Sequence, residues 1–266
     1  MARDTPGRGA RLRASLLCLV IGFAGTLGGA GCARRRAELT TYQAPIPKDG
    51  VVFVADGAGN YQCASDAFRQ AAQEGRIPVQ VVTFEWSHGY LRSLEDLTHR
   101  SHARREGRRL AELVEDYRRA CPGKPVYLAG HSAGAMVVLA ALEYLPVHSV
   151  DRAVLISPAV SCAYDLRPAL QAIKFDLHNF HSDRDWIHCE LFTRIFGNCD
   201  GSRAACAGRC GFLPQATGED DKRLLSKLIQ RPWTERDRET GNDGGHFGAY
   251  QSGFLRASVF PLFDAR

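Results

Sequence analysis

The protein has 266 residues, of which 45% are hydrophobic and 24% are charged. This composition excludes an intrinsically disordered chain and a collagen-like chain, and it is sufficient for one sizeable core. The formal net charge is +5, but four arginines and one aspartate fall within residues 1–31. The rest of the chain is close to charge balance. We therefore expect no nucleic-acid partner, because such binding needs clustered positive charge.

The first 31 residues have the pattern of a secretory signal peptide, because basic residues come first and a run of apolar and small residues follows. The run ends in Gly29-Ala30-Gly31-Cys32, which resembles the end of a bacterial lipoprotein signal, although that family usually has a branched aliphatic residue where Gly29 stands. The resemblance implies that Cys32 becomes the lipid-carrying N-terminus of an exported, membrane-anchored protein of the bacterial cell envelope. Cleavage without lipidation, which would give a periplasmic or secreted protein, and an uncleaved anchor are the alternatives.

Residues 32–50 are polar and contain Pro45 and Pro47, as expected for a tether. The body follows over residues 51–266 as one domain without an internal repeat. Short apolar runs alternate there with segments of helical periodicity, which predicts a parallel sheet with helices on both faces. We expect strands at residues 51–55, 79–84, 126–129, 153–156 and 175–180, and helices at residues 62–74, 104–120 and 133–145.

A G-x-S-x-G motif, Gly130-His131-Ser132-Ala133-Gly134, stands between the third expected strand and the helix that follows it. A serine on so sharp a turn leaves no room for side chains at residues 130 and 134, which explains both glycines. The turn would project the Ser132 hydroxyl above the sheet. It would also leave the Ala133 N–H free at a helix N-terminus, where a developing oxyanion is stabilised. A serine that merely caps the helix is the alternative.

With this strand–turn–helix motif, the chain resembles the α/β-hydrolase family over residues 51–266. The resemblance implies the α/β-hydrolase fold, with a mostly parallel sheet, and an esterase- or lipase-like serine hydrolase. It also implies a second oxyanion donor in the loop at residues 56–60, where the N–H of Ala58 is the first candidate and that of Gly57 the second. Asp56 departs from the His-Gly that the family often has there. Its charge would lie near the oxyanion unless the side chain turns away or binds the loop backbone.

A serine hydroxyl needs a base to remove its proton, and the base needs a carboxylate to orient it. In the family, the acid follows the serine in the chain and lies in a loop after a late strand. The segment after the expected strand at residues 175–180 contains Asp183 and Asp185, and an apolar pair follows Asp185, as often happens at the family's acid. Asp185 is therefore the first candidate, with Asp183 and then Asp165 as alternatives.

Nine histidines are candidates for the base, but most of them precede Ser132, lie in the turn itself or surround the acid loop. His246 lies instead in a glycine-rich loop, residues 241–248, ahead of the apolar C-terminal segment. The family places its histidine in such a loop, after the acid and over the serine. The sequence thus predicts a catalytic triad of Ser132, Asp185 and His246.

The cysteines form a second pattern, because seven of the nine follow residue 32 and four of these fall in a glycine-rich stretch. In an oxidising compartment they are candidates for disulfides, with at least one left unpaired because their number is odd. We therefore expect a cysteine-stapled insertion at about residues 189–215. A zinc site built on Cys206 and Cys210 is the alternative. The seven are Cys63, Cys121, Cys162, Cys189, Cys199, Cys206 and Cys210.

Together these residues predict a hydrolase that cleaves a carboxylic ester, or a related acyl bond, through an acyl-enzyme intermediate. Such a reaction requires neither a metal nor an organic cofactor, and its partner is a small-molecule or lipid ester. The alternative is a non-catalytic envelope lipoprotein that uses the same fold as a binding scaffold, and Asp56 is the residue that favours it.

Overall fold

The computed structural model of the protein describes residues 50–90, 92–185, 197–202 and 205–264. The predicted signal peptide, the lipidation residue Cys32 and nearly all of the tether lie outside the described residues. No helix in the described part of the chain is long and apolar enough to cross a bilayer.

A six-stranded sheet forms the centre of the described body, and every pair of neighbouring strands is parallel. The strand order is β2-β1-β3-β4-β5-β6, so the first two strands of the chain are exchanged in space. The predicted parallel sheet is therefore confirmed. The strands are β1 (Val51–Ala55), β2 (Gln80–Thr83), β3 (Val126–His131), β4 (Val150–Ile156), β5 (Ile173–His181) and β6 (Leu228–Pro232).

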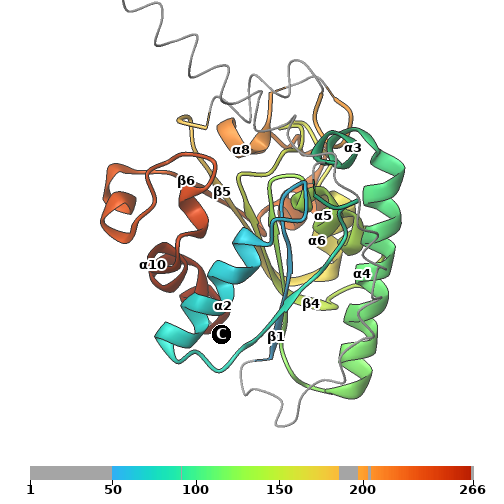
Figure 1. The fold of residues 1–266 in the computed structure, drawn as a ribbon. Helices are drawn as coiled ribbons and strands as arrows, with labels where there is room; N and C mark the ends of the chain where they lie inside the picture. Colours follow the sequence, from blue (N-terminus) through green and yellow to red (C-terminus); the bar gives the residue numbers. More distant parts are fainter. Residues whose placement is uncertain (1–49, 91, 186–196, 203–204, 265–266) are drawn as a thin grey trace, which may run out of the picture. The chain divides into compact units, whose positions relative to one another are not determined.

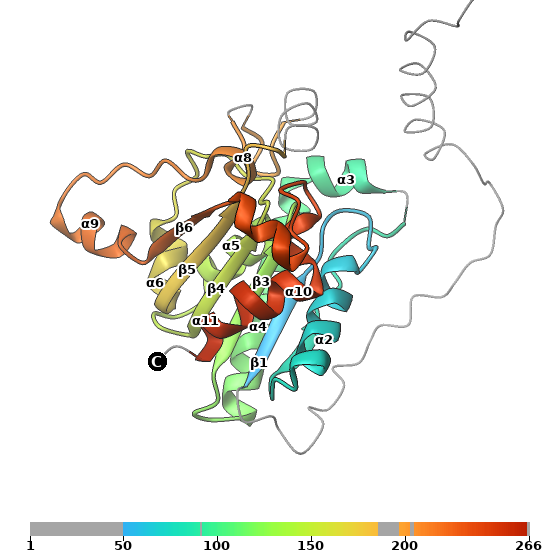
Figure 2. The same cartoon turned by 90° about the vertical axis from the view of Figure 1, so that its left-hand side faces the viewer.

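Helices cover both faces of this sheet (Figures 1 and 2). Helix α5 contacts α4 and α6 on one face, whereas α2, α10 and η4 pack together on the other, with α11 continuing from η4. The described helical segments are α2 (Cys63–Gly75), α3 (Ser93–Thr98), α4 (Arg100–Ala120), α5 (Gly134–Tyr144), α6 (Arg167–Ala172), α8 (Ala207–Cys210), α9 (Glu219–Leu225), η2 (Glu235–Thr240), η3 (Gly248–Tyr250), α10 (Ser252–Phe254), the π-helical turn η4 (Leu255–Val259) and α11 (Phe260–Asp264).

The expected strands and helices overlap the observed β1–β5, α2, α4 and α5. Strand β6 was not expected from the sequence, because it ends in Gln230, Arg231 and Pro232. It lies at the edge of the sheet and pairs only with β5. An edge strand tolerates such residues, because only one side of its backbone joins the sheet. Helices α3 and α6 each have 6 residues, which is too short for an apolar periodicity to be recognised in the sequence.

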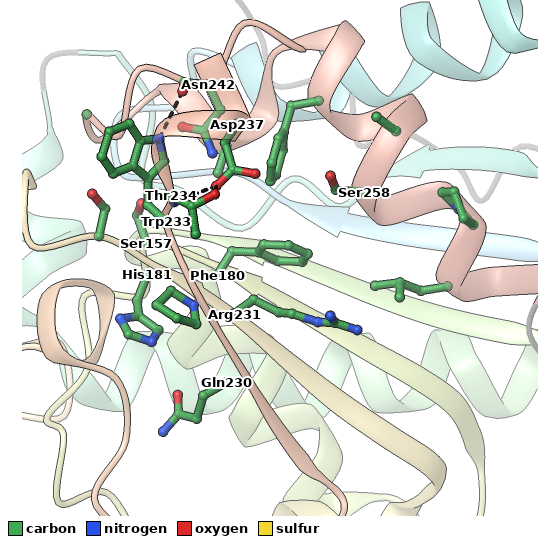
Figure 3. A pocket seen from close by; sticks show the side chains of 18 residues that line it. Ser157, Phe180, His181, Gln230, Arg231, Trp233, Thr234, Asp237, Asn242 and Ser258 are labelled. Carbon is green, nitrogen blue, oxygen red and sulfur yellow. Dashed lines mark hydrogen bonds between the residues drawn. The ribbon is translucent and has the colours of Figure 1, made fainter. Parts of the chain in front are cut away.

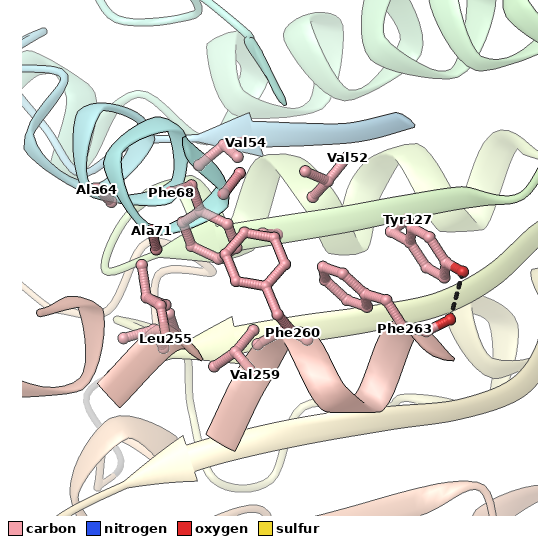
Figure 4. Close-up of a cluster of buried hydrophobic side chains, with 14 of the residues drawn as sticks. Val52, Val54, Ala64, Phe68, Ala71, Tyr127, Leu255, Val259, Phe260 and Phe263 are labelled. Carbon is pink, nitrogen blue, oxygen red and sulfur yellow. Dashed lines mark hydrogen bonds between the residues drawn. The ribbon is translucent and has the colours of Figure 1, made fainter. Parts of the chain in front are cut away.

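An aromatic cluster fastens the end of the described chain to the sheet (Figure 4). Phe260 of α11 packs edge-on against Phe68 of α2, with ring centroids 5.7 Å apart. Phe263 stacks on Tyr127 of β3 at 4.2 Å, and the Tyr127 hydroxyl donates to the Phe263 carbonyl at 2.6 Å. All four side chains are buried, so the C-terminal helices form an integral layer of the domain.

The fold brings several loops together at one edge of the sheet. Strands β1 and β3 are neighbours, but α2 after β1 and α5 after β3 lie on opposite faces. The chain therefore diverges beyond the carboxyl ends of these strands, where α/β proteins place their binding and catalytic sites. The loop after β5 emerges at the same edge, because all the strands run in the same direction.

Candidate active site

The turn after β3 has the strained geometry of a nucleophile elbow. Ser132 has φ 52°, in the left-handed region that residues with side chains rarely adopt. A Cβ at Gly134 would collide with the carbonyl oxygens of Ala55 and Asp56, and one at Gly130 would lie 2.8 Å from the Ala135 Cα. Both glycines of the motif are thus required by close backbone approach. The backbone of Ser132 is held by β4, since its N–H donates to the Ile156 carbonyl at 3.0 Å.

The structure brings the three predicted catalytic side chains into one hydrogen-bonded chain. The Nε2 of His246 lies 2.9 Å from the Ser132 Oγ, and its Nδ1 lies 2.6 Å from Asp185 Oδ2. Asp185 and His246 are buried, whereas Ser132 is half-buried. A carboxylate only accepts, so the imidazole Nδ1–H donates to Asp185 and the Nε2 lone pair faces the hydroxyl. This is the tautomer that a general base needs in order to remove the proton of Ser132.

The two alternative acids lie elsewhere. Asp183 is exposed to solvent. Asp165 is also exposed and forms a salt bridge with Arg167 at 2.8 Å. The N–H of Asp185 donates to the Ser182 carbonyl at 3.1 Å, and this tight turn after β5 directs the Asp185 side chain inward. Of the three candidates, the structure therefore joins Asp185 alone to His246.

Of the predicted oxyanion donors, Ala133 directly follows the serine, and Gly57 in the loop after β1 lies beside it. Ala133 is buried and caps α5, and in the described part of the chain its N–H makes no backbone hydrogen bond. Gly57 lies against the elbow, because a Cβ there would be 3.4 Å from the Ser132 Cβ. The loop after β1 thus passes directly beside the serine, and Ala58 follows Gly57 in this loop. Donors on both sides of a reacting carbonyl are what acyl transfer requires.

Asp56 does not direct its carboxylate at this site. Its Oδ1 accepts the backbone N–H groups of Ala64 at 2.7 Å and Ser65 at 3.1 Å, at the start of α2. Burial raises the pKa of the Asp56 carboxyl, against the lowering effect of the hydrogen bonds from Ser65 and Ala64. The residue that departs from the family pattern therefore caps a helix N-terminus, which is a site that favours a carboxylate.

His131 has a role that the motif did not predict. Its Nε2 lies 3.1 Å from the main-chain carbonyl of His246, so the ring donates to the backbone of the histidine loop. The Tyr250 ring packs edge-on against it at 4.8 Å. The residue between Gly130 and Ser132 of the G-x-S-x-G motif thus links the elbow to the loop that carries the base. The sequence shows a histidine next to the serine, but it does not show the hydrogen-bond partner of this histidine, because that partner is 115 residues away.

The loop around His246 is fixed by its own hydrogen bonds. Asn242 is buried, and its side-chain oxygen accepts the Gly244 N–H at 3.0 Å. Its main-chain carbonyl accepts the Trp233 indole N–H at 2.9 Å (Figure 3). A Cβ at Gly248 would collide with the Asn242 side chain. The glycines of this segment therefore allow tight packing that positions the imidazole.

A cavity of about 540 Å³ lies between β6 and the C-terminal helices (Figure 3). Ser182 and Gly245, which are close in sequence to Asp185 and His246, border it, as do Phe180 and Arg231. The described residues that line it do not include Ser132. We therefore do not take this cavity as the acyl-binding pocket.

The cysteines differ from the sequence expectation. In the described part of the chain, six cysteines are free thiols, and they form no disulfide staple. Cys206 instead directs its Sγ to the Pro158 carbonyl at 2.9 Å, and Cys210 directs its Sγ to the Cys206 carbonyl at 3.3 Å. Cys189, the first cysteine of the predicted insertion, lies outside the described residues. Backbone hydrogen bonds around 158–162 and 205–213 hold this segment together.

The sequence matches the profile of the Alpha/beta hydrolase family over residues 51–256. This match spans most of the chain, and the protein therefore belongs to that family. The fold predicted from the serine motif is confirmed. No relative of the chain was found among curated proteins.

Several solved structures are similar to this chain. A cutinase from Trichoderma reesei has 14% sequence identity and a TM-score of 0.41, covering 83% of this chain and 80% of the cutinase. A lidless α/β serine hydrolase from Xanthomonas campestris has 18% identity and a TM-score of 0.45, with 81% and 82% coverage. An α/β serine hydrolase homologue from Coxiella burnetii has 12% identity and a TM-score of 0.46, with 82% and 87% coverage.

Proposed function

We propose that the protein is a serine hydrolase that cleaves a carboxylic ester through an acyl-enzyme intermediate. The observation that carries this proposal is the hydrogen-bonded chain from Ser132 through His246 to Asp185, with separations of 2.9 Å and 2.6 Å. The left-handed backbone of Ser132 supports it, since such strain is retained where surrounding structure holds it for function.

The geometry supports the following sequence of steps. His246 Nε2 takes the hydroxyl proton as the Ser132 Oγ attacks the acyl carbonyl, and Asp185 stabilises the resulting imidazolium without taking its proton. The N–H groups of Ala133 and Ala58 donate to the tetrahedral oxyanion. The imidazolium returns the proton to the departing alcohol. His246 then activates a water molecule, which releases the acid and regenerates Ser132.

Exposed aromatic side chains beside His246 and beside the loop after β1 favour an ester with an apolar group. Phe247 directly follows His246, its ring lies 5.2 Å from the imidazole, and it is 50% exposed. Tyr61 and Tyr90, which are 50% and 65% exposed, pack edge-on at 5.6 Å beside the loop after β1. Exposed aromatic rings provide contact area for an apolar acyl chain or alcohol. Thioesters and amides are variants of the same chemistry.

Labelling with a fluorophosphonate probe tests the nucleophile directly, because the probe forms a covalent bond with an activated serine. The wild-type protein should label, and Ser132→Ala should not. Ser226→Ala, which removes an exposed hydroxyl bonded to the Arg223 carbonyl, is the matched control and should label like wild type. A folded wild-type protein that does not label, or equal labelling of Ser132→Ala, would overturn the proposal.

Ester turnover provides the second measurement. With p-nitrophenyl esters of graded chain length, Ser132→Ala should lower kcat/KM by about 10⁴-fold or more. The preferred chain length then identifies the acyl group. Asp56 was the residue that favoured the alternative of a non-catalytic scaffold. Because its carboxylate caps α2, it no longer supports that alternative.

We further propose that residues 1–31 are a signal peptide, that Cys32 carries lipid, and that a tether over residues 32–50 connects it to the hydrolase body. The pattern Gly29-Ala30-Gly31-Cys32 supports this placement in the bacterial cell envelope. In bacterial cells supplied with a palmitate analogue, the full chain should incorporate the label and sediment with membranes. Cys32→Ser should lose both properties. Unlabelled wild-type protein would refute lipidation.

A further inference from the structure

A second cluster of chemically active side chains lies outside the triad, on α3 and the residues that flank it. Figure 1 shows where α3 lies in the fold. His88, Glu95 and His99 bring one ligand atom each within 4.8 Å of the others. Glu95 and His99 are four residues apart, and the His99 N–H donates to the Glu95 carbonyl at 2.9 Å, so both side chains lie on one side of this helical turn. The rings of His88 and His99 meet edge-on, with centroids 5.5 Å apart.

Asp96 fixes the ring of His88 in a metal-binding orientation. Its buried carboxylate accepts the His88 Nδ1–H at 2.8 Å and the His88 backbone N–H at 2.9 Å. The Nδ1 is therefore occupied, and Nε2 is the nitrogen with a lone pair to offer. Metal-binding histidines commonly donate their other N–H to a carboxylate, which orients the ring and makes the ligating nitrogen more basic.

The same carboxylate is fully used by the protein and is not itself a free ligand. Besides His88, Asp96 accepts the Gly59 N–H at 2.8 Å and the Ser87 hydroxyl at 2.5 Å. His102 is also near, and its ring is tilted against that of His88 with centroids 3.8 Å apart, but its Nε2 bonds the Trp86 carbonyl at 2.6 Å. These contacts hold His88 in place, and the residues that remain as ligands for a metal ion are His88, Glu95 and His99.

The chemistry of the donor set fits zinc. Two imidazole nitrogens and one carboxylate oxygen are typical zinc ligands, and water completes the tetrahedron in a three-ligand site. Bonds of about 2.0–2.1 Å place tetrahedral ligand atoms roughly 3.4 Å apart, so the cluster must contract by a small side-chain movement. His99 is exposed and the Glu95 side chain is 38% exposed. Rotation of these two side chains supplies that movement.

One existing interaction competes with a metal ion. Glu95 forms a two-point salt bridge with Arg92, whose side chain is 51% exposed. Exposed ion pairs of this kind contribute little to stability because water screens them, so a zinc ion can displace the guanidinium at small cost. The Arg92 side chain then extends into solvent.

We propose that His88, Glu95 and His99 bind one Zn²⁺ ion, with water as the fourth ligand. The ion joins α3 to the loop after β2. Because Asp96 holds both His88 and the Gly59 N–H, the ion also braces the loop that carries Ala58. Its role is structural, since the proposed reaction uses Ser132, His246 and the backbone N–H groups.

Zinc binding by the metal-free full chain tests this proposal, measured by competition with a chromophoric chelator. Wild type should bind one equivalent, and His99→Ala and Glu95→Gln should each bind about 10-fold to 100-fold more weakly. His148→Asn is the matched control, because His148 is exposed on another loop and has φ 58°, which asparagine tolerates. It should bind zinc like wild type.

The exposed thiols of Cys63 and Cys210 are present in every variant, so a difference between variants reports the histidine site. Zinc should also raise the thermal midpoint of wild type and of His148→Asn more than that of His99→Ala. Equal affinity and equal thermal shifts in wild type and His99→Ala, or no binding to wild type, would overturn the proposal. The readout needs no substrate and is therefore independent of whether Ser132 is a nucleophile.

Discussion

His131 shows how one side chain couples two distant parts of the active site. It precedes Ser132 in the elbow, and its Nε2–H donates to the carbonyl of His246 at 3.1 Å. The elbow is held in turn by the Ser132 N–H, which donates to the Ile156 carbonyl. The backbones of the nucleophile and of the base are therefore tied together, independently of the bond between their side chains. Such pre-organisation keeps the reacting atoms within reach.

We predict that His131→Phe lowers kcat with little change in KM. The phenyl ring retains packing against Tyr250 but loses the donor to the His246 carbonyl. One neutral hydrogen bond contributes about 0.5–1.5 kcal/mol, so kcat should fall by up to about 10-fold. Steady-state kinetics with a p-nitrophenyl ester measure both parameters.

His131→Gln is the rescue variant, since its amide restores a donor and should recover part of the lost kcat. Thermal midpoints of both variants are measured alongside. If kcat is unchanged in folded His131→Phe, or if the glutamine variant gives no recovery despite equal stability, the positioning role is wrong.

The triad illustrates which parts of a site a sequence can predict. Ser132 stands in a local motif with a required strand–turn–helix setting, and His246 stands in a glycine-rich loop after the acid. Asp183 and Asp185 are only two residues apart, so the sequence could rank them but not decide between them. Their difference arises from the Ser182 turn, which buries one carboxylate and exposes the other.

At the level of elements, α2 depends on a residue outside it. The Gln62 side chain makes no capping hydrogen bond at the start of α2, and Asp56, which follows β1, accepts the Ala64 and Ser65 N–H groups instead. The first turn of the helix is thereby attached to the end of the strand. The carboxylate stabilises the helix dipole but is itself buried, and burial raises its pKa.

This raised pKa predicts a pH-dependent effect of Asp56→Asn. As pH rises from 4 to 7, the unfolded chain releases the Asp56 proton before the folded chain does, which favours unfolding. Wild type therefore loses this contribution to its free energy of unfolding, while the asparagine variant, which keeps an acceptor for α2, does not titrate there. The stability of Asp56→Asn relative to wild type should increase over this interval.

Urea unfolding at pH 4, 5, 6 and 7 measures the difference. Asp66→Asn, which neutralises an exposed aspartate in the first turn of the same helix, controls for the loss of one negative charge. If the free energy of unfolding of Asp56→Asn instead falls relative to that of wild type as pH rises, the assigned cause is wrong.

The elements that the sequence predicts share a physical property. Strands β1 and β3 and helix α5 are buried throughout or nearly so, and their apolar runs are long enough to be recognised. The edge strand β6 and the short helix α3 lack such runs. Contacts with distant parts of the chain stabilise them instead. The Asp96 network that fixes α3 joins residues 37 positions apart. No local pattern reports such a contact.

For the body as a whole, the C-terminal helices close one face of the sheet, and the histidine loop lies between β6 and these helices in the chain. Phe260 is 1% exposed and packs against Phe68, and Phe263 stacks on Tyr127. Leu255 and Val259 of η4 belong to the same core. The stability of the domain therefore depends on this layer, which follows the histidine loop in the chain.

We predict that Phe260→Ala strongly destabilises the protein while the folded fraction keeps its chemistry. Truncating a buried phenylalanine costs about 3–5 kcal/mol, which in a domain of this size lowers Tm by roughly 6–20 °C.

Phe175→Ala is the matched control, because Phe175 is 38% exposed, and its Tm should fall far less. Calorimetry gives Tm, and fluorophosphonate labelling well below Tm gives the active fraction. Since Phe260 touches the core rather than the triad, labelling at low temperature should match wild type. A small Tm change would show that the core tolerates the cavity, whereas lost labelling in folded Phe260→Ala would show that the C-terminal layer also positions His246.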